Sequence, residues 1–295
     1  MSSIEKAMAQ KKTSVPSFAL EPPSPLNHQP THVKKHNLHH SDNPTEAFIG
    51  ERIDLNLDIL EQRGFITPKN PKSRIAEEYR LIKRPILKTI FKNEQFDDSP
   101  NNLLMVTSAL QGEGKTFTAV NLAISIAMEY NHEVLLIDAD TIKPETSKIF
   151  GIQKKHGLME ILQGTAYESD VILNTNIPSL YVIGSGENHP FATELLASQQ
   201  MLGFITNIAK KHPHWVIIFD TPPLLMTTQS SVLAHFMSQI IFVISAGNTL
   251  QTAAKEAVAM LDQTEQVVWA VMNKSQQSMG SSYSYGYGYG ENNSN

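Results

Sequence analysis

The sequence predicts an α/β fold in which a mostly parallel β-sheet is covered by helices on both faces. Between residues 101 and 275, short apolar runs typical of buried strands alternate with stretches of helical spacing. A glycine-containing loop joins the first of these runs to a helix, and acidic residues directly follow two of the later runs. Because ligands bind at the carboxyl ends of the strands in such sheets, these residues mark the expected site.

The composition of the 295-residue chain limits its functions. With 41% hydrophobic and 18% charged residues, it can bury a sizeable core. Its net charge of −5 argues against a nucleic-acid partner held by phosphate neutralisation. Because cysteine is absent, disulfides, thiolate zinc sites and iron–sulfur clusters are excluded. The sequence shows no signal-peptide pattern and no apolar run of the ~18 residues that would span a bilayer, which predicts a soluble, cytoplasmic protein.

Residues 1–45 are expected to form a disordered leader, because they are rich in proline and show no apolar period. Five histidines lie between His28 and His40. A histidine tract without fixed geometry is a weak indication of a metal site, so metal binding is not expected there.

Residues 46–100 are predicted to be an N-terminal helical segment. The run that starts at Ile53 predicts a short helix that Gly64 stops, and the apolar period over residues 73–91 predicts a longer amphipathic helix. Pro85 is expected to kink this second helix or to end its first half.

Three charged residues of the second helix, Glu77, Arg80 and Lys83, lie one turn apart and opposite its apolar face. Two interpretations fit this pattern. One is a solvated charged face, which is the more common arrangement; the other is a contact with a neighbouring subunit, through which the segment would serve oligomerisation.

The sequence Ser108-Ala-Leu-Gln-Gly-Glu-Gly-Lys-Thr116 predicts a phosphate-binding loop (P-loop), because a strand-like run precedes it and a helix follows. Gly112 and Gly114 allow successive N–H groups to face one anion at the positive end of the helix. Lys115 can reach the β- and γ-phosphates, and the Thr116 hydroxyl can bind Mg²⁺. The expected nucleotide-binding residues here are Gln111, Gly112, Glu113, Gly114, Lys115, Thr116 and Phe117.

Six apolar runs are candidate strands: residues 103–106, 133–137, 180–183, 215–219, 240–244 and 267–271. Asp138 and Asp140 follow the second run, and Asp220 follows the fourth. Each aspartate alone would be interpreted as a helix cap or turn residue, but three strand-end carboxylates beside a P-loop favour a Mg²⁺ site. Asp138 and Asp140 share one face of an extended segment, so one can order the metal and the other can accept a proton.

Residues 276–295 are predicted to be a flexible tail in which tyrosines alternate with Gly and Ser. The tyrosines are Tyr283, Tyr285, Tyr287 and Tyr289. From composition alone, the tail is either a low-complexity terminus or a phosphate acceptor.

At these residues the chain resembles the bacterial tyrosine kinases, the autokinases of exopolysaccharide synthesis and export. Residues 111–116, 135–140 with Lys143-Pro144 after them, and 217–223 are similar to the family's Walker A, Walker A′ and Walker B motifs. Glu77-x-x-Arg80-x-x-Lys83 resembles the oligomerisation motif, although the family has Arg in the last place. Residues 74–85 look specifically like the exosortase-associated branch. The resemblance covers about residues 50 to 290 and implies the deviant-Walker superfamily of Min and partitioning ATPases.

The resemblance implies that ATP and Mg²⁺ bind at the loop and that the γ-phosphoryl passes in trans to the tail tyrosines of a neighbouring subunit. Lys115 would stabilise the phosphates, Thr116, Asp140 and Asp220 would serve the metal, and Asp138 would be the base, although the sequence does not separate Asp138 from Asp140. Ile142 and Lys143 stand where the family often has two basic residues. Asn273 matches the place where related ATPases contact adenine, but it suits a strand-end turn equally well.

The resemblance also implies partners. They are further copies of the chain in a homo-oligomer such as a ring, a membrane protein of the polysaccharide chain-length (co-polymerase) type as activator, and a cognate tyrosine phosphatase. Through the membrane partner, the protein would be recruited to the inner membrane face.

The main alternative is an ATPase switch of the Min or partitioning type without tyrosine kinase activity. Leu110 stands where partitioning ATPases carry an interface lysine, and the chain ends in Tyr and Gly rather than in a basic amphipathic helix. Both features favour the kinase. A catalytically weak regulatory subunit is a third class, against which the intact Lys115 and the three aspartates argue.

Overall fold

The computed structural model describes residues 50–91, 100–261 and 266–275. These residues all belong to one compact unit that begins at Ala47. The predicted leader, residues 1–45, and the predicted tail, residues 276–295, lie outside the described residues, and the boundary near residue 100 stays a prediction.

The described strands are β1 (Arg52–Ile53), β2 (Leu103–Ser108), β3 (Glu133–Asp138), β4 (Leu173–Thr175), β5 (Leu180–Ile183), β6 (Trp215–Asp220), β7 (Gln239–Ser245) and β8 (Val267–Asn273). The described helices are α1 (Leu57–Gln62), α2 (Arg74–Ile90), α3 (Lys115–Ala127), α4 (Glu145–Ile149), α5 (Leu158–Leu162), α6 (Glu168–Val171), α7 (Ala192–Leu196), α8 (Gln199–Lys211), α9 (Gln229–Ala234) and α10 (Gln251–Ala259).

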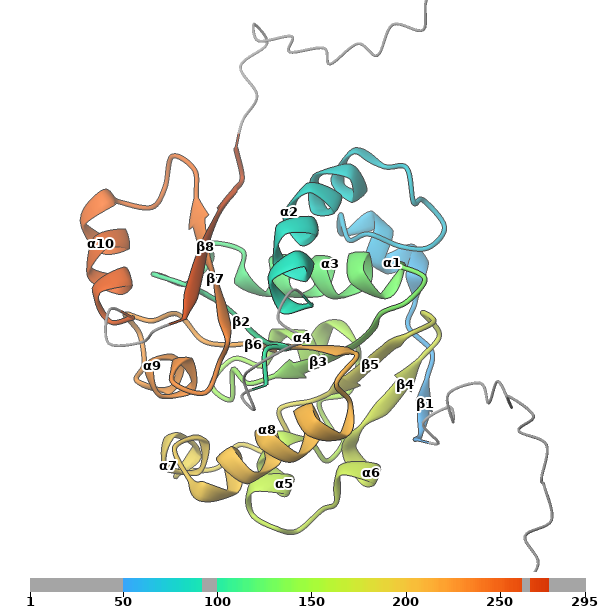
Figure 1. The fold of residues 1–295 in the computed structure, drawn as a ribbon, viewed down its shortest axis with the longest axis vertical. Helices are drawn as coiled ribbons and strands as arrows, with labels where there is room; N and C mark the ends of the chain where they lie inside the picture. Colours follow the sequence, from blue (N-terminus) through green and yellow to red (C-terminus); the bar gives the residue numbers. More distant parts are fainter. Residues whose placement is uncertain (1–49, 92–99, 262–265, 276–295) are drawn as a thin grey trace, which may run out of the picture. The chain divides into compact units, whose positions relative to one another are not determined.

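The strands form one sheet in the order β1-β4-β5-β3-β6-β2-β7-β8 (Figure 1). Neighbouring strands run parallel, except β4 and β5, which are antiparallel. The predicted mostly parallel sheet is therefore confirmed. All six predicted strands are present, whereas β1 and β4 were missed because strands of two or three residues carry too little periodicity to be recognised.

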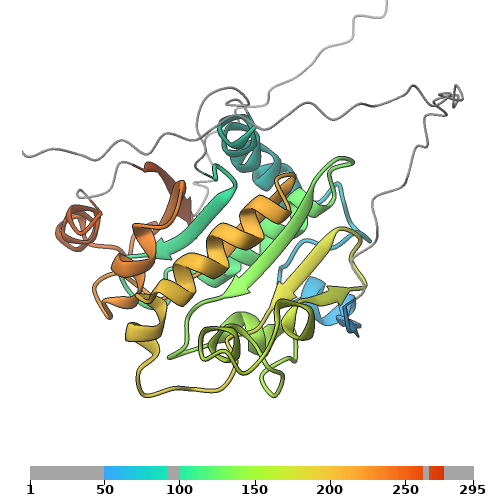
Figure 2. The same cartoon turned by 60° about the horizontal axis from the view of Figure 1, so that its bottom comes forward.

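Helices cover both faces of the sheet, and Figure 2 shows α8 lying across one of them. The sheet separates two hydrophobic cores, and successive side chains of β2 point alternately into one and then the other. Leu103 and Met105 pack with residues of α5 to α10, whereas Leu104 and Val106 pack with residues of α1 to α3. Because both faces are covered, the central strands are buried along their whole length and appear in the sequence as unbroken apolar runs.

The N-terminal helices differ from the prediction at one end. Residues Arg52–Ile53 pair with β4 as an edge strand, so α1 begins only at Leu57, where the Oδ1 atom of Asn56 accepts a hydrogen bond from the Ile59 N–H (3.1 Å). Gly64, with φ of 83°, follows α1 as predicted. Helix α2 continues through Pro85, so the expectation that this proline ends the first half of the helix was wrong.

The charged face of α2 is only partly solvated. Glu77 and Arg80 pair with each other near the surface, but Lys83 is just 4% exposed. Its ammonium group donates a hydrogen bond to the Ser125 carbonyl at the end of α3 and lies 2.7 Å from Glu129. The interpretation as a solvated face therefore fails for Lys83, which ties α2 to α3 within one chain.

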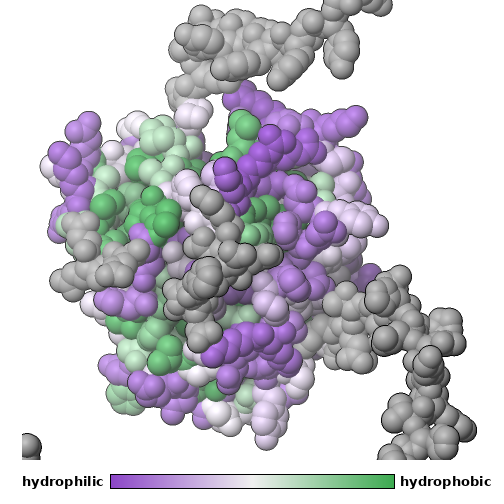
Figure 3. Space-filling model, in the orientation of Figure 1, coloured by the Kyte–Doolittle hydropathy of each residue, from purple (hydrophilic) through white to green (hydrophobic). Residues whose placement is uncertain are grey.

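The hydropathy of the surface differs between the two sides of the view in Figure 3. Figure 3 shows hydrophilic residues gathered on the side of α1 and α2, and apolar patches on the side of α10 and β8. The edge strand β8 contributes exposed Val267, Val268 and Met272. Among the described residues, no helix combines the length and the apolar character needed to cross a membrane.

Candidate active site

The P-loop lies between the end of β2 and the start of α3, as the sequence predicted. Gly112 and Gly114 have φ of 83° and 101°, a region in which a side chain is strained. A Cβ atom on Gly114 would also lie 1.9 Å from the amide nitrogen of Asn273, so only glycine fits there. Ala109, which replaces the usual first glycine, is fully buried and accepts a hydrogen bond from the Leu225 N–H (3.2 Å).

Residues from distant parts of the chain brace this loop. The Glu113 side chain accepts hydrogen bonds from the Leu110 N–H (2.8 Å) and from the Thr249 hydroxyl, so it turns away from the anion site. The Glu113 carbonyl accepts one from Asn273 Nδ2 (2.9 Å), and Lys274 Nζ donates to the Gly112 carbonyl (2.6 Å). Asn273 thus reaches the loop itself. Thr249 and Lys274 were missed, because no local pattern links them to a loop more than a hundred residues away.

The strand-end aspartates meet because β3 and β6 are neighbours in the sheet. Asp138 and Asp220 stand opposite each other in the register, and both are fully buried. Asp138 Oδ2 accepts hydrogen bonds from the backbone N–H and the hydroxyl of Ser147, both at 2.7 Å. Asp220 Oδ2 accepts one from Thr146 Oγ1 (2.8 Å). The first turn of α4 therefore holds both carboxylates.

Lys115 completes this group. Its Nζ atom lies 2.7 Å from Asp140 Oδ2, and only 9% of the residue is exposed. Asp140 Oδ1 accepts a hydrogen bond from the Lys143 N–H (2.9 Å), which fixes the carboxylate at the pocket wall. The structure thus brings Lys115 together with all three predicted acids.

Burial and like charges change the proton affinities in this cluster. Burial, assisted by the charge of Asp220, raises the pKa of Asp138 to about 8, while the Ser147 hydrogen bonds oppose the rise. Burial also raises the pKa of Asp220. Burial acts to lower the pKa of Lys115, but the Asp220 and Asp140 charges outweigh it, and the net shift is upward. Such a crowded acidic group favours an added cation.

One carboxylate oxygen of this acidic cluster is suited to bind Mg²⁺. Within the described part of the chain, the Oδ1 atom of Asp220 is buried without a hydrogen-bond partner. The Thr116 side chain acts to lower the pKa of this carboxyl, against the rise that burial causes. An unsatisfied carboxylate oxygen beside the loop hydroxyl is the donor set expected of a metal bound with phosphates. Among the described residues, no group of three or more His, Asp or Glu side chains is arranged to hold a metal ion.

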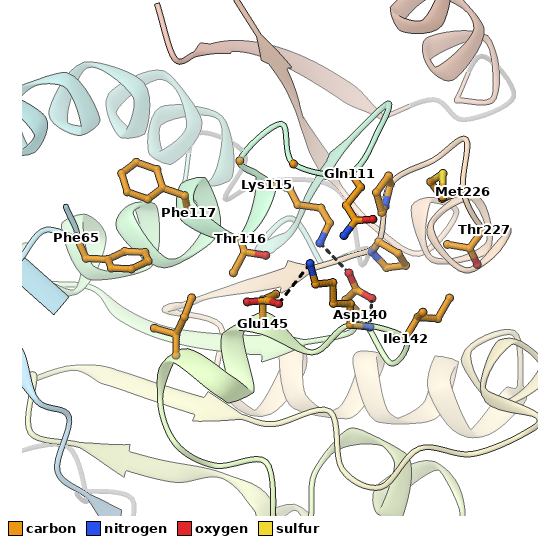
Figure 4. A pocket seen from close by; sticks show the side chains of 16 residues that line it. Phe65, Gln111, Lys115, Thr116, Phe117, Asp140, Ile142, Glu145, Met226 and Thr227 are labelled. Carbon is orange, nitrogen blue, oxygen red and sulfur yellow. Dashed lines mark hydrogen bonds and ion pairs between the residues drawn. The ribbon is translucent and has the colours of Figure 1, made fainter. Parts of the chain in front are cut away.

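A pocket of about 360 Å³ opens beside the loop (Figure 4). Asp140 lines it, whereas the fully buried Asp138 and Asp220 do not. Apart from Phe117, the sequence did not predict the apolar part of the lining, which includes Phe65 from the loop after α1. The lining residues are Phe65, Gln111, Gly112, Gly114, Lys115, Thr116, Phe117, Asp140, Ile142, Lys143, Glu145, Ile149, Pro222, Pro223, Met226 and Thr227.

The other predicted functional residues are not gathered at this pocket. Glu77, Arg80 and Lys83 belong to α2, and their role in oligomerisation stays a prediction. The four tail tyrosines lie outside the described residues. Of the residues the sequence missed, Thr146 and Ser147 had the clearest signal, because they directly follow Pro144-Glu145, a helix-start pattern just after the Asp138–Asp140 motif.

Comparisons with known proteins find tyrosine kinases among the relatives of this chain. Residues 103–275 match the family model described as an AAA domain. The chain is 34% identical to tyrosine-protein kinase YwqD of Bacillus subtilis, over 75% of this chain and 90% of that protein. It is 32% identical to tyrosine-protein kinase CpsD of Streptococcus agalactiae serotype III, over 73% and 90%. The kinase domain of the Escherichia coli tyrosine kinase ETK superposes with a TM-score of 0.64 at 26% identity, covering 80% of this chain and 94% of that domain.

Proposed function

This chain belongs to the bacterial tyrosine-protein kinase family, and from that premise we propose that it is an autokinase of exopolysaccharide synthesis and export that phosphorylates its own C-terminal tyrosines in trans. The observation that carries the proposal is the convergence of Lys115 and three aspartates beside a glycine-shaped phosphate loop. Such a group can bind a triphosphate, stabilise the charge that develops during phosphoryl transfer and accept the proton of the attacking hydroxyl.

The nucleotide of this proposal is ATP with Mg²⁺. The N–H groups of the loop and the positive end of α3 would hold the phosphates, and Lys115 would exchange its contact with Asp140 for phosphate oxygens. Thr116 and Asp220 would hold Mg²⁺, with Asp140 assisting at the pocket wall. The metal supplies neutralisation of the charge on the transferred group.

For the base, we propose Asp138. Burial raises its pKa to about 8, so its deprotonated form is a stronger proton acceptor than an ordinary carboxylate. Asp140 is already engaged by Lys115 and by the Lys143 N–H. Asp138 is buried and does not line the pocket, so this role requires that opening of the Lys115–Asp140 pair by phosphate give an acceptor hydroxyl access to it.

The proposed acceptors are Tyr283, Tyr285, Tyr287 and Tyr289 of a neighbouring copy. Copies would associate as a homo-oligomer through α2, where Glu77 and Arg80 remain accessible while Lys83 is engaged internally. A membrane protein of the polysaccharide chain-length type would recruit and activate the kinase at the inner membrane face, and a tyrosine phosphatase would reverse the reaction. Residues 74–85 support the exosortase-associated branch.

Incubation of the purified full chain with ATP and Mg²⁺ tests the proposal. Phosphotyrosine should accumulate within residues 283–289, as peptide mass spectrometry would show. Lys115→Met should abolish the signal, because it removes the ammonium group that balances the phosphates. Steady ATP hydrolysis without phosphotyrosine would instead support the Min- or partitioning-type switch.

A further inference from the structure

Three large apolar side chains of the segments around the active site are exposed, and two of them, Ile142 and Met226, line its pocket. Ile142 is 66% exposed, Met226 is 62% exposed and Leu110 is 36% exposed. Each comes from a different catalytic segment: the P-loop, the turn after Asp140 and the turn after Asp220. We call these three residues the apolar rim.

Two of the three rim residues lie at one pocket, and a backbone hydrogen bond links the segment of the third residue to the segment of Met226. Ile142 and Met226 both line the pocket, and Figure 4 shows them on the same side of Lys115 and Asp140. The backbones next to Leu110 and Met226 are joined, because the Leu225 N–H donates to the Ala109 carbonyl (3.2 Å). Single exposed apolar residues are ordinary, but a group at the mouth of a functional pocket indicates a ligand with an apolar face.

The charges near the rim restrict that ligand further. Asp140 and Glu145 line the same pocket, and Lys143 lies 3.6 Å from Glu145. Each of these acids is paired with a lysine of the same pocket, so a ligand that rests on the rim and reaches past it suits a flat apolar body with a polar tip. A neutral tyrosine side chain has this form.

The chain itself supplies such a ligand. Residues 283–289 carry four tyrosines separated by single Ser or Gly residues, so every ring is free of bulky or charged sequence neighbours. The tail leaves the sheet at the edge that carries the site, because Lys274, one residue before Ser275, donates to the Gly112 carbonyl. Tyr283 follows Ser275 by eight residues, a span of up to about 28 Å in an extended chain.

We propose that the apolar rim is the docking surface for the acceptor tyrosine ring of the 283–289 segment, and that Ile142 and Met226 set the apparent affinity for this acceptor. The inference rests on the proposed autokinase function and goes beyond it, because it assigns acceptor recognition to residues outside the phosphate-binding motifs. The rim acts on binding of the acceptor and not on the transfer step.

The test separates acceptor binding from phosphoryl transfer. The acceptor is the full chain with Lys115→Met, which presents an intact tail but cannot phosphorylate it. The donor is the full chain with Y283S, Y285S, Y287S and Y289S, so that all phosphotyrosine appears on the acceptor. The donor is compared with a version that also carries Ile142→Ser and Met226→Ser, and the initial rate is measured against acceptor concentration.

The rim variant should show a KM for the acceptor about tenfold higher, and this rise should clearly exceed any change in kcat at saturating acceptor or in the KM for ATP. A donor with Ile142→Leu and Met226→Leu should stay near the original KM, because apolar surface is retained. Phe191→Ser is the matched control, since Phe191 is also 62% exposed but precedes α7 and does not line the pocket. It should leave all constants unchanged.

The outcomes are distinguishable. An acceptor KM that is unchanged in the rim variant overturns the inference and leaves the autokinase proposal standing. A rise in the KM for ATP that parallels the rise for the acceptor shows that the rim serves the nucleotide, which also overturns the inference. If the donor with an intact rim produces no phosphotyrosine, the proposed function fails and the inference fails with it.

Discussion

At the scale of single residues, the site depends on buried charges whose neighbours come from short local turns. Asp138 is fully buried, yet hydrogen bonds from both the backbone and the hydroxyl of Ser147 reach one of its oxygens. Burial raises the pKa of Asp138, and these two bonds moderate the rise because they favour the charged form. Ser147 therefore helps to set the pH at which Asp138 can accept a proton.

The first residue-scale prediction concerns Ser147→Ala. The variant loses one of the three hydrogen bonds that the Asp138 carboxylate accepts, the others coming from the Ser147 and Asp140 N–H groups, so the pKa of Asp138 should rise further. The deprotonated base then becomes available only at higher pH. We expect the acid limb of the pH profile of kcat to move to higher pH than in the unaltered protein. An unmoved acid limb with a uniformly lower rate would contradict the assignment of Asp138 as base.

A second residue-scale prediction concerns pH and stability at the opposite end of the sheet. The His212 ring stacks on Trp215 with centroids 3.8 Å apart, and its Nε2 atom is buried without a partner among the described residues. Burial lowers the pKa of His212, so the folded state binds this proton less readily than the unfolded chain. The stabilising contribution is complete above the unfolded pKa near 6.5 and is lost as the pH falls below it.

The variant His212→Phe keeps the stacked ring but cannot bind a proton. We expect its midpoint of urea unfolding to fall less between pH 7.5 and pH 5.5 than that of the unaltered protein. His132 has a lowered pKa as well, so part of the acid sensitivity should remain. Identical pH dependences of the two proteins would show that His212 takes no part in it.

At the scale of elements, α2 is held on α3 by a buried ammonium group as well as by apolar packing. Tyr79, Ile86 and Ile90 of α2 are buried in the core that α2 shares with α3. Lys83 adds its bonds to the Ser125 carbonyl and to Glu129 at the other helix. This contact orients the face of α2 that carries Glu77 and Arg80.

The element-scale prediction is that Lys83→Ala destabilises the fold by about 1–3 kcal/mol, because a buried carbonyl and a carboxylate lose a charged donor. Arg84→Ala is the matched control, since Arg84 is the next residue and is exposed. It should change the free energy of unfolding by less than about 0.5 kcal/mol. Denaturant titration of both variants measures the difference, and equal small effects would refute a structural role for Lys83.

At the scale of the whole molecule, the P-loop depends on the far end of the chain. The last described strand, β8, ends at Asn273, which donates to the Glu113 carbonyl and occupies the space over Gly114. The same strand end leads into the proposed acceptor tail. The end of β8 therefore both braces the P-loop and leads into the proposed acceptor tail.

The prediction at this scale concerns Asn273→Ala. Loss of one neutral hydrogen bond to the loop should weaken ATP binding about threefold to tenfold, as measured by calorimetry. Ser275→Ala, at an exposed position two residues on, should have no effect. Competition with GTP separates the two roles of Asn273. A brace on the loop predicts equal losses for ATP and GTP, whereas a contact with adenine predicts a loss confined to ATP.

By itself, the sequence determined the parallel sheet, its six longer strands, the loop from Ser108 to Thr116 and the strand-end positions of the three aspartates. These features follow from local rules: apolar runs, helical spacing, and the backbone freedom of glycine. Asp138, Asp140 and Asp220 could be placed at one edge because parallel strands end on the same side of a sheet.

The contacts that surround these residues could be known only from the three-dimensional packing. It showed that Lys83 is buried, that Thr146 and Ser147 hold the acids, that Asn273 and Lys274 brace the loop, and that Ile142 and Met226 stand exposed beside the pocket. Each of these facts depends on which remote segments pack together. Burial and hydrogen-bond partners are properties of that packing, whereas periodicity and turn chemistry act between residues that are close in the chain.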